Sequence, residues 1–272
     1  MSLSNRVALI EPKQLAERLA EEDLLLLHVS AADRYIEAHI PGAVLVTPAD
    51  LVCGVPPATG RLPEKAALDA LFSRIGYSPT SQIVVYDDEG GGWAGRMAWT
   101  LDVIGHDGWT YLNGGIHAWH HAGLPLDTGP QPKRAAAQVD VSIDPTPIAE
   151  IPDVLEAIDD PQQVIWDARS AEEFAGLRQT ATRVGHMPGA INLDWLDVQD
   201  RAQECRVVDD LAGVLEQRGI AGKGAIITHC HTHHRSGLTY MLGRLQGLDI
   251  RAYHGSWSEW GNRDDTPIEL PA

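Results

Sequence analysis

The sequence predicts an α/β protein made of two tandem domains, each with a mostly parallel sheet flanked by helices. Three observations support this prediction. A chain of 272 residues is long enough for two ordinary domains, each with its own core. The two halves of the chain repeat the same order of apolar runs and turn sequences. Within each half, buried strands alternate with helical patterns, which is typical of parallel sheets covered by helices.

The first repeated element is a buried strand followed by a turn. The runs LLLLHV at 24–29 and VIWDAR at 164–169 have the length and apolar character of buried strands. A His-x-Pro-Gly-Ala unit follows each run, starting at His39 in the first half and at His186 in the second. Because Pro-Gly favours a turn and the unit occurs twice, we expect a structural turn whose histidine bonds to the backbone.

The second repeated element is a strand that leads directly into a helix. QIVVYDD at 82–88 and AIITHC at 225–230 are apolar runs that end in polar residues. The helical patterns at 93–105 and 235–247 follow them, and both end on a glycine, which is a helix stop signal. The sequence therefore predicts the same strand, loop and helix in both halves.

The domain boundary is expected where these patterns stop. The halves close on Trp119 and Trp260, both of which we expect in the core. The stretch 125–147 is rich in proline, aspartate and small residues and has no apolar period, so it is expected to be a linker. The two domains then cover residues 1–124 and 148–272.

The repeat also separates structural from functional features. A feature that both halves share is most simply structural, whereas one that only one half has is a better functional candidate. Cys230 is of the second kind, because the aligned residue of the first half is Asp87, which cannot be a sulfur nucleophile. The second half is therefore expected to carry the site.

The loop after Cys230 is suited to stabilising a thiolate. A short loop between a strand and a helix directs backbone N–H groups and the helix N-terminus at one point. Arg235 adds a permanent positive charge, and His231, His233 and His234 add hydrogen-bond donors. We expect these groups to hold the pKa of Cys230 below the free value of about 8.5.

Three interpretations of this loop compete. A zinc site is disfavoured because the sequence lacks a second cysteine pair and adjacent residues cannot all face one ion, so no metal is expected. Cysteine phosphatases have five residues between the cysteine and the arginine, whereas only four separate Cys230 from Arg235 here. The third interpretation is an inert buried cysteine, which would not require a surrounding set of histidines and an arginine.

Composition limits the partners and the compartment. A formal charge of −17 argues against binding to nucleic acid or to an anionic membrane. The sequence shows no signal peptide pattern and no run long enough to span a membrane. Three cysteines, of which Cys53 and Cys205 have no cationic setting, do not form a disulfide framework. We therefore expect a cytoplasmic protein with free thiols.

Taken together, these marks resemble the rhodanese family of sulfurtransferases. They are the tandem halves, His186-Met-Pro-Gly-Ala, the loop Cys230-His-Thr-His-His-Arg235, and the ending Gly255-Ser-Trp-Ser-Glu-Trp260. The resemblance is closest to two-domain bacterial members with a Cys-x-Thr-His-His-Arg loop. It implies two rhodanese-like domains, of which the first is inactive and the second catalytic.

The resemblance also implies a mechanism. The Cys230 thiolate would take the outer sulfur of thiosulfate, release sulfite and become a persulfide. Cyanide or a dithiol would then remove that sulfur, so that no cofactor is needed. We expect a monomer. Relatives that use 3-mercaptopyruvate have a glycine-rich loop ending in Ser or Thr, whereas this loop ends in Arg235, which favours thiosulfate. A 3-mercaptopyruvate sulfurtransferase and a persulfide carrier for protein acceptors, such as those of iron–sulfur assembly, remain alternatives.

Two further residues are peculiar to the second half. Arg183 aligns with Ile36, and Trp195 aligns with Pro48. Arg183 resembles a family arginine that faces the anionic substrate, and Trp195 is suited to walling the pocket. In the same half, Asp167 and Arg169 are expected to pair structurally beneath the site. The expected substrate-binding residues are Arg235, Arg183, His231, Thr232, His233, His234, Ser236 and Trp195, around the catalytic Cys230.

Overall fold

A computed structural model describes residues 7–106, 108–130 and 138–270. Within these residues the chain divides into two compact units. Unit 1 consists of Met1–Leu51, Pro63–Asp144 and Asp200–Val207, and unit 2 consists of Val52–Leu62, Pro145–Gln199 and Val208–Ala272. Each unit therefore includes a short segment from the other half of the sequence. Residues 131–137 of the expected linker lie outside the described residues.

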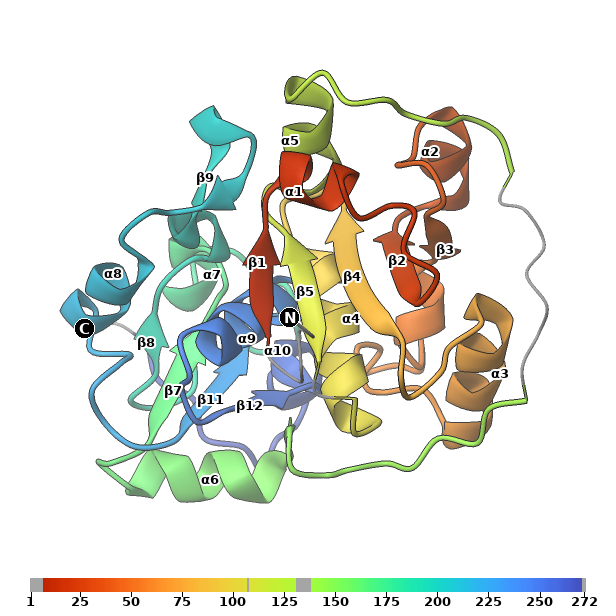
Figure 1. Ribbon diagram of the computed structural model, residues 1–272. Helices are drawn as coiled ribbons and strands as arrows, with labels where there is room; N and C mark the ends of the chain where they lie inside the picture. Colours follow the sequence, from red (N-terminus) through yellow and green to blue (C-terminus); the bar gives the residue numbers. More distant parts are fainter. Residues whose placement is uncertain (1–6, 107, 131–137, 271–272) are drawn as a thin grey trace. The chain divides into compact units, whose positions relative to one another are not determined.

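Unit 1 is built on one parallel sheet (Figure 1). Its strands lie in the order β1 (Ala8–Ile10), β5 (Trp109–Leu112), β4 (Gln82–Asp87), β2 (Leu24–Val29) and β3 (Val44–Val46). Its helices are α1 (Pro12–Ala16), α2 (Ala32–Glu37), the 3-10 helix η1 (Pro48–Leu51), α3 (Lys65–Ile75), α4 (Gly92–Val103) and α5 (Gly115–His121).

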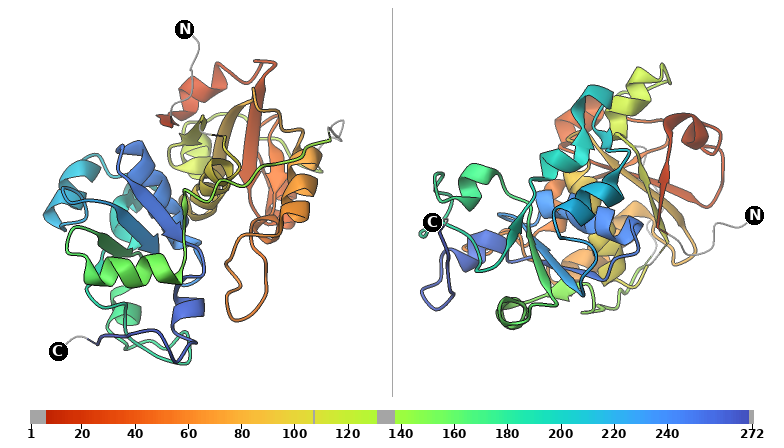
Figure 2. Two further views of the ribbon diagram at one scale, coloured as in Figure 1. Left: turned by 90° about the horizontal axis from the view of Figure 1, so that it is seen from below. Right: turned by 90° about the vertical axis from the view of Figure 1, so that its left-hand side faces the viewer.

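Unit 2 repeats this arrangement, and Figure 2 gives two further views of the sheets and their helices. Its parallel strands lie in the order β6 (Ile148–Ala149), β12 (Ile250–Tyr253), β11 (Ile226–His229), β7 (Val164–Asp167) and β8 (Ile191–Asn192). Its helices are α6 (Ile151–Asp159), α7 (Ala171–Phe174), η2 (Trp195–Val198), α8 (Leu211–Gln217), α9 (Arg235–Leu245) and α10 (Ser256–Trp260). The chain from 199 to 207, which belongs to unit 1 from Asp200 on, forms β9 (Gln199–Asp200), η3 (Arg201–Gln203) and β10 (Arg206–Val207), in which β9 pairs with β10. The expected α/β fold with two mostly parallel sheets is confirmed.

The elements form where the apolar patterns predict them. The strand expected at 24–29 is β2 with the same bounds, and the strand expected at 82–88 is β4, one residue shorter. The helix expected at 93–105 is α4, which begins at Gly92 and ends at Val103. The helix expected at 235–247 is α9, which ends at Leu245 before the left-handed Gly247.

Each unit has a separate apolar core, and the shared motifs support it. Trp119 and Trp260 are completely buried in the cores of units 1 and 2, as expected. His39 Nδ1 lies 2.7 Å from the Tyr35 carbonyl oxygen, and His186 Nδ1 lies 2.9 Å from that of Phe174. The histidines of both His-x-Pro-Gly-Ala units therefore bond to the backbone, which confirms their structural role.

The strand register verifies the alignment of the two halves. Ile83 of β4 pairs with Trp109, the first residue of β5, just as Ile226 of β11 pairs with Ile250, the first residue of β12. Four positions beyond Ile83 and Ile226, the chain reaches Asp87 and Cys230 respectively. These two residues therefore occupy the same place in their units.

Candidate active site

Cys230 lies at the carboxyl end of β11, in a short loop that leads into α9. The loop residues 230–234 connect the last residue of the strand, His229, to the first helical residue, Arg235. The Cys230 residue is only 1% exposed, whereas its loop neighbours His231 and Thr232 are half-buried. Cys230 is therefore buried, and the partly exposed residues of its loop, here called the mouth of the loop, follow it in the sequence.

The surroundings of Cys230 favour its thiolate. Burial by itself would raise the pKa of the thiol. The positive charge of Arg235, the hydroxyl and backbone N–H of Ser236 and the backbone N–H of Thr232 outweigh this effect and lower the pKa. The expected depression of the Cys230 pKa thus has a structural basis in three residues of the loop and of the first turn of α9.

Arg235 is held by a carboxylate that the sequence analysis did not identify. Its two terminal nitrogens donate to the two oxygens of Glu173, at 2.5 and 2.9 Å. The Glu173 side chain is 4% exposed, and although burial opposes ionisation, the bond to Arg235 lowers its pKa. Glu173 also forms a capping box with Ser170 at the start of α7. The position of the cation beside Cys230 is therefore set from another element.

The loop histidines take different positions. His231 is half-buried, and burial followed by the field of Arg235 lowers its pKa, so it is neutral at pH 7. The ring of His234 lies 5.5 Å from that of Trp195, and both residues are partly exposed. His233 is completely buried, with Nδ1 2.8 Å from Ser236 Oγ. His233 was expected to contact substrate together with its neighbours, but burial directs its imidazole to Ser236.

Three buried polar residues lie close to Cys230. His229 precedes it at the end of β11, and Asp167 and Arg169 lie at the end of the neighbouring strand β7 and just after it. Asp167 accepts from Arg169 Nε at 2.9 Å, and the Arg169 guanidinium lies 4.1 Å from the ring centre of Trp257. His229 Nε2 lies 3.6 Å from Asp167 Oδ2, and all of these side chains are buried. The expected structural pair of Asp167 and Arg169 is present, and His229 extends it towards the nucleophile.

The backbone around Cys230 is held by the start of α10. The Cys230 N–H donates to Ser256 Oγ at 3.3 Å, and the Trp257 N–H donates to the Cys230 carbonyl at 3.0 Å. The Ser258 N–H donates to the carbonyl of His231 at 2.9 Å. Residues of the segment Gly255–Trp260, which in the sequence is a mark of the family, therefore fix the backbone of the nucleophile.

Segment 52–62 also contacts the loop within unit 2. A Cβ atom on Gly60 would lie 2.1 Å from the Thr232 carbonyl oxygen, so the two backbones touch and only glycine fits. Arg61 next to it pairs with Glu150 and Glu259 at 2.6 and 2.9 Å. The sequence offered no signal for this contact, because it joins residues far apart in the chain.

Arg183 lies on a different part of unit 2. Its guanidinium donates to the carbonyl oxygens of Thr266 and Trp260, at 2.9 and 3.0 Å, and also to the Thr266 hydroxyl. These contacts tie Arg183 to the chain after α10 and not to the loop of Cys230. Its role toward substrate stays a prediction.

The equivalent loop of unit 1 is filled by its own carboxylate. Asp87 Oδ1 accepts from the N–H groups of three successive residues at 2.8 to 3.2 Å, and Oδ2 accepts from two more at 2.9 and 3.0 Å. The donors are Glu89, Gly90, Gly91, Trp93 and Ala94. Counted from Asp87, Glu89 and Trp93 correspond to Thr232 and Ser236, whose N–H groups bond to Cys230. The same backbone positions therefore hold an anion in both units.

Other features of the molecule lie away from this chemistry. Cys53 and Cys205 are free and half-buried; burial raises the pKa of Cys205. Among the described residues, no group of three or more histidine, cysteine or acidic side chains is arranged to hold a metal ion, and the absence of a metal stays a prediction. In the described part of the chain, no helix is both long and apolar enough to cross a membrane.

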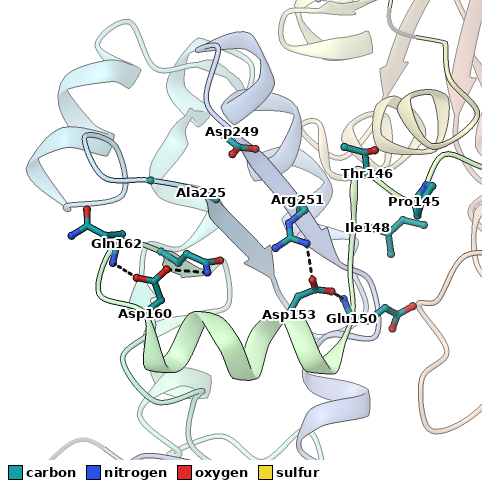
Figure 3. A pocket seen from close by; sticks show the side chains of 12 residues that line it. Pro145, Thr146, Ile148, Glu150, Asp153, Asp160, Gln162, Ala225, Asp249 and Arg251 are labelled. Carbon is teal, nitrogen blue, oxygen red and sulfur yellow. Dashed lines mark hydrogen bonds and ion pairs between the residues drawn. The ribbon is translucent and has the colours of Figure 1, made fainter.

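Unit 2 also has a hollow of about 850 Å³ at the opposite end of its strands. Figure 3 shows it beside α6, with Ala225 and Asp249 at the amino ends of β11 and β12. Its lining is mainly polar and acidic, and Arg251 in it is paired with Asp153 at 2.8 Å. Cys230 lies beyond the other end of β11, so this hollow is not where the nucleophile acts.

Two α/β units with a thiolate-stabilising loop in one and a carboxylate-filled loop in the other define a two-domain protein with one cysteine site. The chain belongs to the rhodanese family: the model of the rhodanese-like domain matches residues 11–122 and 150–263. Thiosulfate sulfurtransferase of Pseudomonas aeruginosa is 47% identical over 264 residues, covering 96% of both chains. Thiosulfate sulfurtransferase of Azotobacter vinelandii is 45% identical over 262 residues, with the same coverage. The 3-mercaptopyruvate sulfurtransferase of Escherichia coli K12 is 28% identical, over 88% of this chain and 86% of the relative. The resemblance seen in the sequence is thereby confirmed.

Proposed function

We propose that this protein is a thiosulfate:cyanide sulfurtransferase that carries the transferred sulfur as a persulfide on Cys230. The observation that carries the proposal is the depressed pKa of Cys230 in a loop whose twin in unit 1 binds a carboxylate. A loop built to hold an anion, with a sulfur nucleophile at its first position, is suited to an anionic sulfur intermediate.

The first step is a displacement at sulfur. The Cys230 thiolate attacks the outer sulfur of thiosulfate, a new S–S bond forms, and the S–S bond of thiosulfate breaks. Sulfite leaves with the electron pair, so the cysteine becomes a persulfide and no external oxidant or reductant is needed. The N–H groups of Thr232 and Ser236, which bond to the thiolate in the free enzyme, are placed to hold the negative charge of the persulfide.

The second step restores the thiolate. Cyanide attacks the terminal sulfur, thiocyanate leaves, and the electron pair of the S–S bond returns to Cys230. A thiol or dithiol acceptor follows the same course and leaves as its persulfide. Because the sulfur passes between nucleophiles through Cys230 alone, the proposed cycle uses no cofactor and has ping-pong kinetics.

The mouth of the loop supplies the substrate contacts. Arg235 provides the positive charge that lowers the Cys230 pKa, and its bidentate pair with Glu173 keeps it in place. His231 and Thr232 line the opening, and the half-buried rings of His234 and Trp195 form one wall. A wall of aromatic rings would limit water at the persulfide. We place Arg183 in a supporting position, because its bonds are to the chain at 260–266.

Thiosulfate is favoured over 3-mercaptopyruvate as the donor. The loop ends in Arg235 and has no glycine between Cys230 and Arg235. The relatives at 45 to 47% identity bear the name thiosulfate sulfurtransferase, whereas the one named for 3-mercaptopyruvate is 28% identical. We further propose a monomer that works in the cytoplasm, where its three cysteines stay free. Sulfur-accepting proteins remain possible acceptors besides small thiols.

Intact-mass spectrometry tests the proposal. After treatment with thiosulfate we expect the protein to gain the mass of one sulfur atom, and to lose it when cyanide is added. The Cys230→Ala variant should gain none, although it keeps Cys53 and Cys205 as internal controls. An unmodified protein that hydrolyses an aryl phosphate instead would overturn the proposal in favour of a phosphatase. Rates with thiosulfate and 3-mercaptopyruvate, measured side by side, decide between the two donors.

A further inference from the structure

His233 has a backbone conformation that its residue type disfavours. Its φ angle is 56°, in the left-handed region where a side chain other than that of glycine crowds the backbone. The equivalent residue of unit 1, three positions after Asp87, is Gly90 with a φ angle of 93°. Both loops therefore need a left-handed residue at this position, and only the loop with the nucleophile has a histidine there.

The imidazole of His233 has a defined partner inside the unit. The residue is completely buried, and Nδ1 lies 2.8 Å from the hydroxyl oxygen of Ser236, which is also completely buried. A buried side chain that is kept in a disfavoured backbone conformation and contacts a buried hydroxyl points to a specific role for that contact. Burial also separates His233 from the mouth of the loop, where His231 and His234 are partly exposed.

The hydroxyl of Ser236 connects this contact to the nucleophile. Hydrogen bonding from this hydroxyl and from the Ser236 N–H lowers the pKa of Cys230, so both groups act as donors toward its sulfur. A hydroxyl has one hydrogen to donate, and a thiolate only accepts. Because that hydrogen goes to the sulfur, the hydroxyl oxygen accepts from His233, whose Nδ1 must carry the proton. The order of donation is therefore from His233 Nδ1–H to Ser236 Oγ–H to the Cys230 sulfur.

Unit 1 lacks every member of this chain. When Cys230 is aligned with Asp87, the residue equivalent to His233 is Gly90 and the residue equivalent to Ser236 is Trp93. Trp93 and Gly90 offer backbone N–H groups to the Asp87 carboxylate. The histidine and the serine thus accompany the sulfur nucleophile, while the shared backbone donors do not depend on them.

We propose that His233 is a positioning residue, which orients the Ser236 hydroxyl so that it donates to the sulfur of Cys230. If no group donates to the oxygen of the Ser236 hydroxyl, the hydroxyl can rotate and its hydrogen can turn away from the sulfur. When His233 donates to that oxygen, the hydrogen stays directed at Cys230. The inference rests on the proposed function only in taking Cys230 as the nucleophile. It assigns the buried loop histidine to the thiolate and not to the substrate.

The test measures the thiolate directly. The rate of iodoacetamide alkylation at Cys230, resolved from Cys53 and Cys205 by peptide mass spectrometry, is followed against pH in the full-length protein. The variants are His233→Gly and His233→Asn, each also made in a Ser236→Ala background. Both replacements suit a left-handed backbone, but only asparagine has a side-chain N–H near the position of Nδ1. The other charged or titratable groups near the sulfur stay unchanged in all variants: Arg235, Glu173, His229, Asp167, Arg169 and His231.

His233→Gly should move the alkylation midpoint to higher pH and slow alkylation below the midpoint by about threefold, because a weakened bond to the thiolate favours the thiol. His233→Asn should recover most of that loss. In the Ser236→Ala background, His233→Gly should add no further shift, because His233 acts through the hydroxyl. Thermal melting confirms that each variant is folded.

Three results would overturn the inference: a His233→Gly profile equal to that of the parent, equal effects of the glycine and asparagine variants, or an undiminished shift in the Ser236→Ala background. Alkylation does not require sulfur transfer. If the parent takes no sulfur from thiosulfate while the midpoints move as expected, the proposed function fails and the inference stands. If sulfur transfer is present and the midpoints do not move, the inference alone fails.

Discussion

The loops after β4 and β11 share the same backbone N–H donors but differ in the residue that these donors surround. In unit 1 the Asp87 carboxylate fills the loop and accepts five backbone N–H groups. In unit 2 Cys230 takes the same position, and N–H groups of the equivalent residues bond to its sulfur. In unit 1 the five donors to the carboxylate are all backbone N–H groups. The first residue of the loop then determines which anion the N–H groups bind: the side chain of an aspartate in unit 1, or a group that includes sulfur from a substrate in unit 2.

The layer adjacent to the two loops differs in charge. In unit 1, His28 stacks on Tyr86 with ring centres 4.3 Å apart, and burial lowers the pKa of His28 to about 3, so this layer is neutral. In unit 2 the layer contains Asp167, Arg169 and His229. Buried charges are costly unless they are paired, so the Asp167–Arg169 pair close to the nucleophile indicates a role in its electrostatic setting.

The largest effect is expected when the second loop is given the residue of the first. Cys230→Asp should abolish sulfur transfer, a loss of more than about 10³-fold, because a carboxylate cannot form a persulfide. It should nevertheless fold well, since the carboxylate meets the N–H groups of Thr232 and Ser236 and the charge of Arg235. The measurements are the cyanide assay and thermal melting.

Cys230→Ala is the matched control for that substitution. It also removes the nucleophile, but it leaves the N–H groups of the loop without their anion. We expect it to melt below Cys230→Asp by several degrees. A Cys230→Asp protein that is the less stable of the two would show that the second loop is not an anion cradle like the first.

The next largest effect is expected at the cation that only the second loop has. Arg235→Ala removes the positive charge that lowers the Cys230 pKa, so that pKa should rise. The acid limb of the kcat/KM profile should then move to higher pH. At a pH below the pKa of both the parent and the variant, the activity should fall by about tenfold for each unit of that rise. Arg235→Lys keeps the charge but not the bidentate pair, so the limb should move less.

The same substitution should change how stability depends on pH. The folded pKa of Glu173 is depressed, with burial opposing and the bond to Arg235 favouring the carboxylate. Its contribution to stability is therefore present at neutral pH and is lost as the pH falls through the folded pKa, below the usual 4.5. Arg235→Ala should cost about 2–4 kcal/mol at pH 7, since it leaves a buried carboxylate unpaired. A gap to the parent that stays constant down to acid pH would contradict this account.

The sequence was sufficient for the fold and for the nucleophile, because both depend on local patterns and on the repeat. Continuous apolar runs predicted β2 and β4 nearly to the residue, and the register supports the pairing of Asp87 with Cys230. The loop length between Cys230 and Arg235 is also a property of the sequence alone. These features do not require knowledge of which distant elements meet.

The features that could not be predicted depend on contacts between residues that lie far apart in the sequence. Glu173 lies 62 positions before Arg235, and Gly60 reaches Thr232 from the other half of the chain. No periodicity relates these residues. The role of the loop histidines could not be predicted either. The buried position of His233 goes with a left-handed backbone, and a histidine in a sequence does not indicate that conformation.

A smaller effect, on stability only, is expected in the loop of unit 1. Asp87→Ala leaves five N–H groups without an acceptor, of which three are buried and two are partly buried, and should cost about 3–5 kcal/mol. Asp87→Asn keeps one acceptor oxygen and should cost less. Denaturant unfolding measures both. Activity per folded molecule should stay at the parent level, since Cys230 and its loop are unchanged; a fall in kcat at full folding would instead assign unit 1 a part in the chemistry.

The smallest effect is expected at Ser256, where the two units differ by one side chain on the same backbone. Ser256 has a φ angle of 53°, and the equivalent Gly115 has one of 55°. In unit 1 a Cβ atom there would lie 2.4 Å from the Asp87 carbonyl oxygen, so only glycine fits. Ser256→Gly relieves a left-handed backbone, worth about 1 kcal/mol, and loses hydrogen bonds of similar total value. The unfolding free energy should therefore change by less than about 1 kcal/mol.

The alkylation midpoint of Cys230 should also be unchanged in Ser256→Gly. The Ser256 hydroxyl donates its hydrogen to the Tyr253 carbonyl at 2.9 Å and accepts the Cys230 N–H, so it has no hydrogen for the sulfur. Ser236→Ala, which removes a hydroxyl that does bond to the sulfur, is the contrasting variant. If Ser256→Gly moved the midpoint as far as Ser236→Ala, the two serines would share one role. It would then be wrong to assign Ser256 to the backbone of Cys230 and Ser236 to its thiolate.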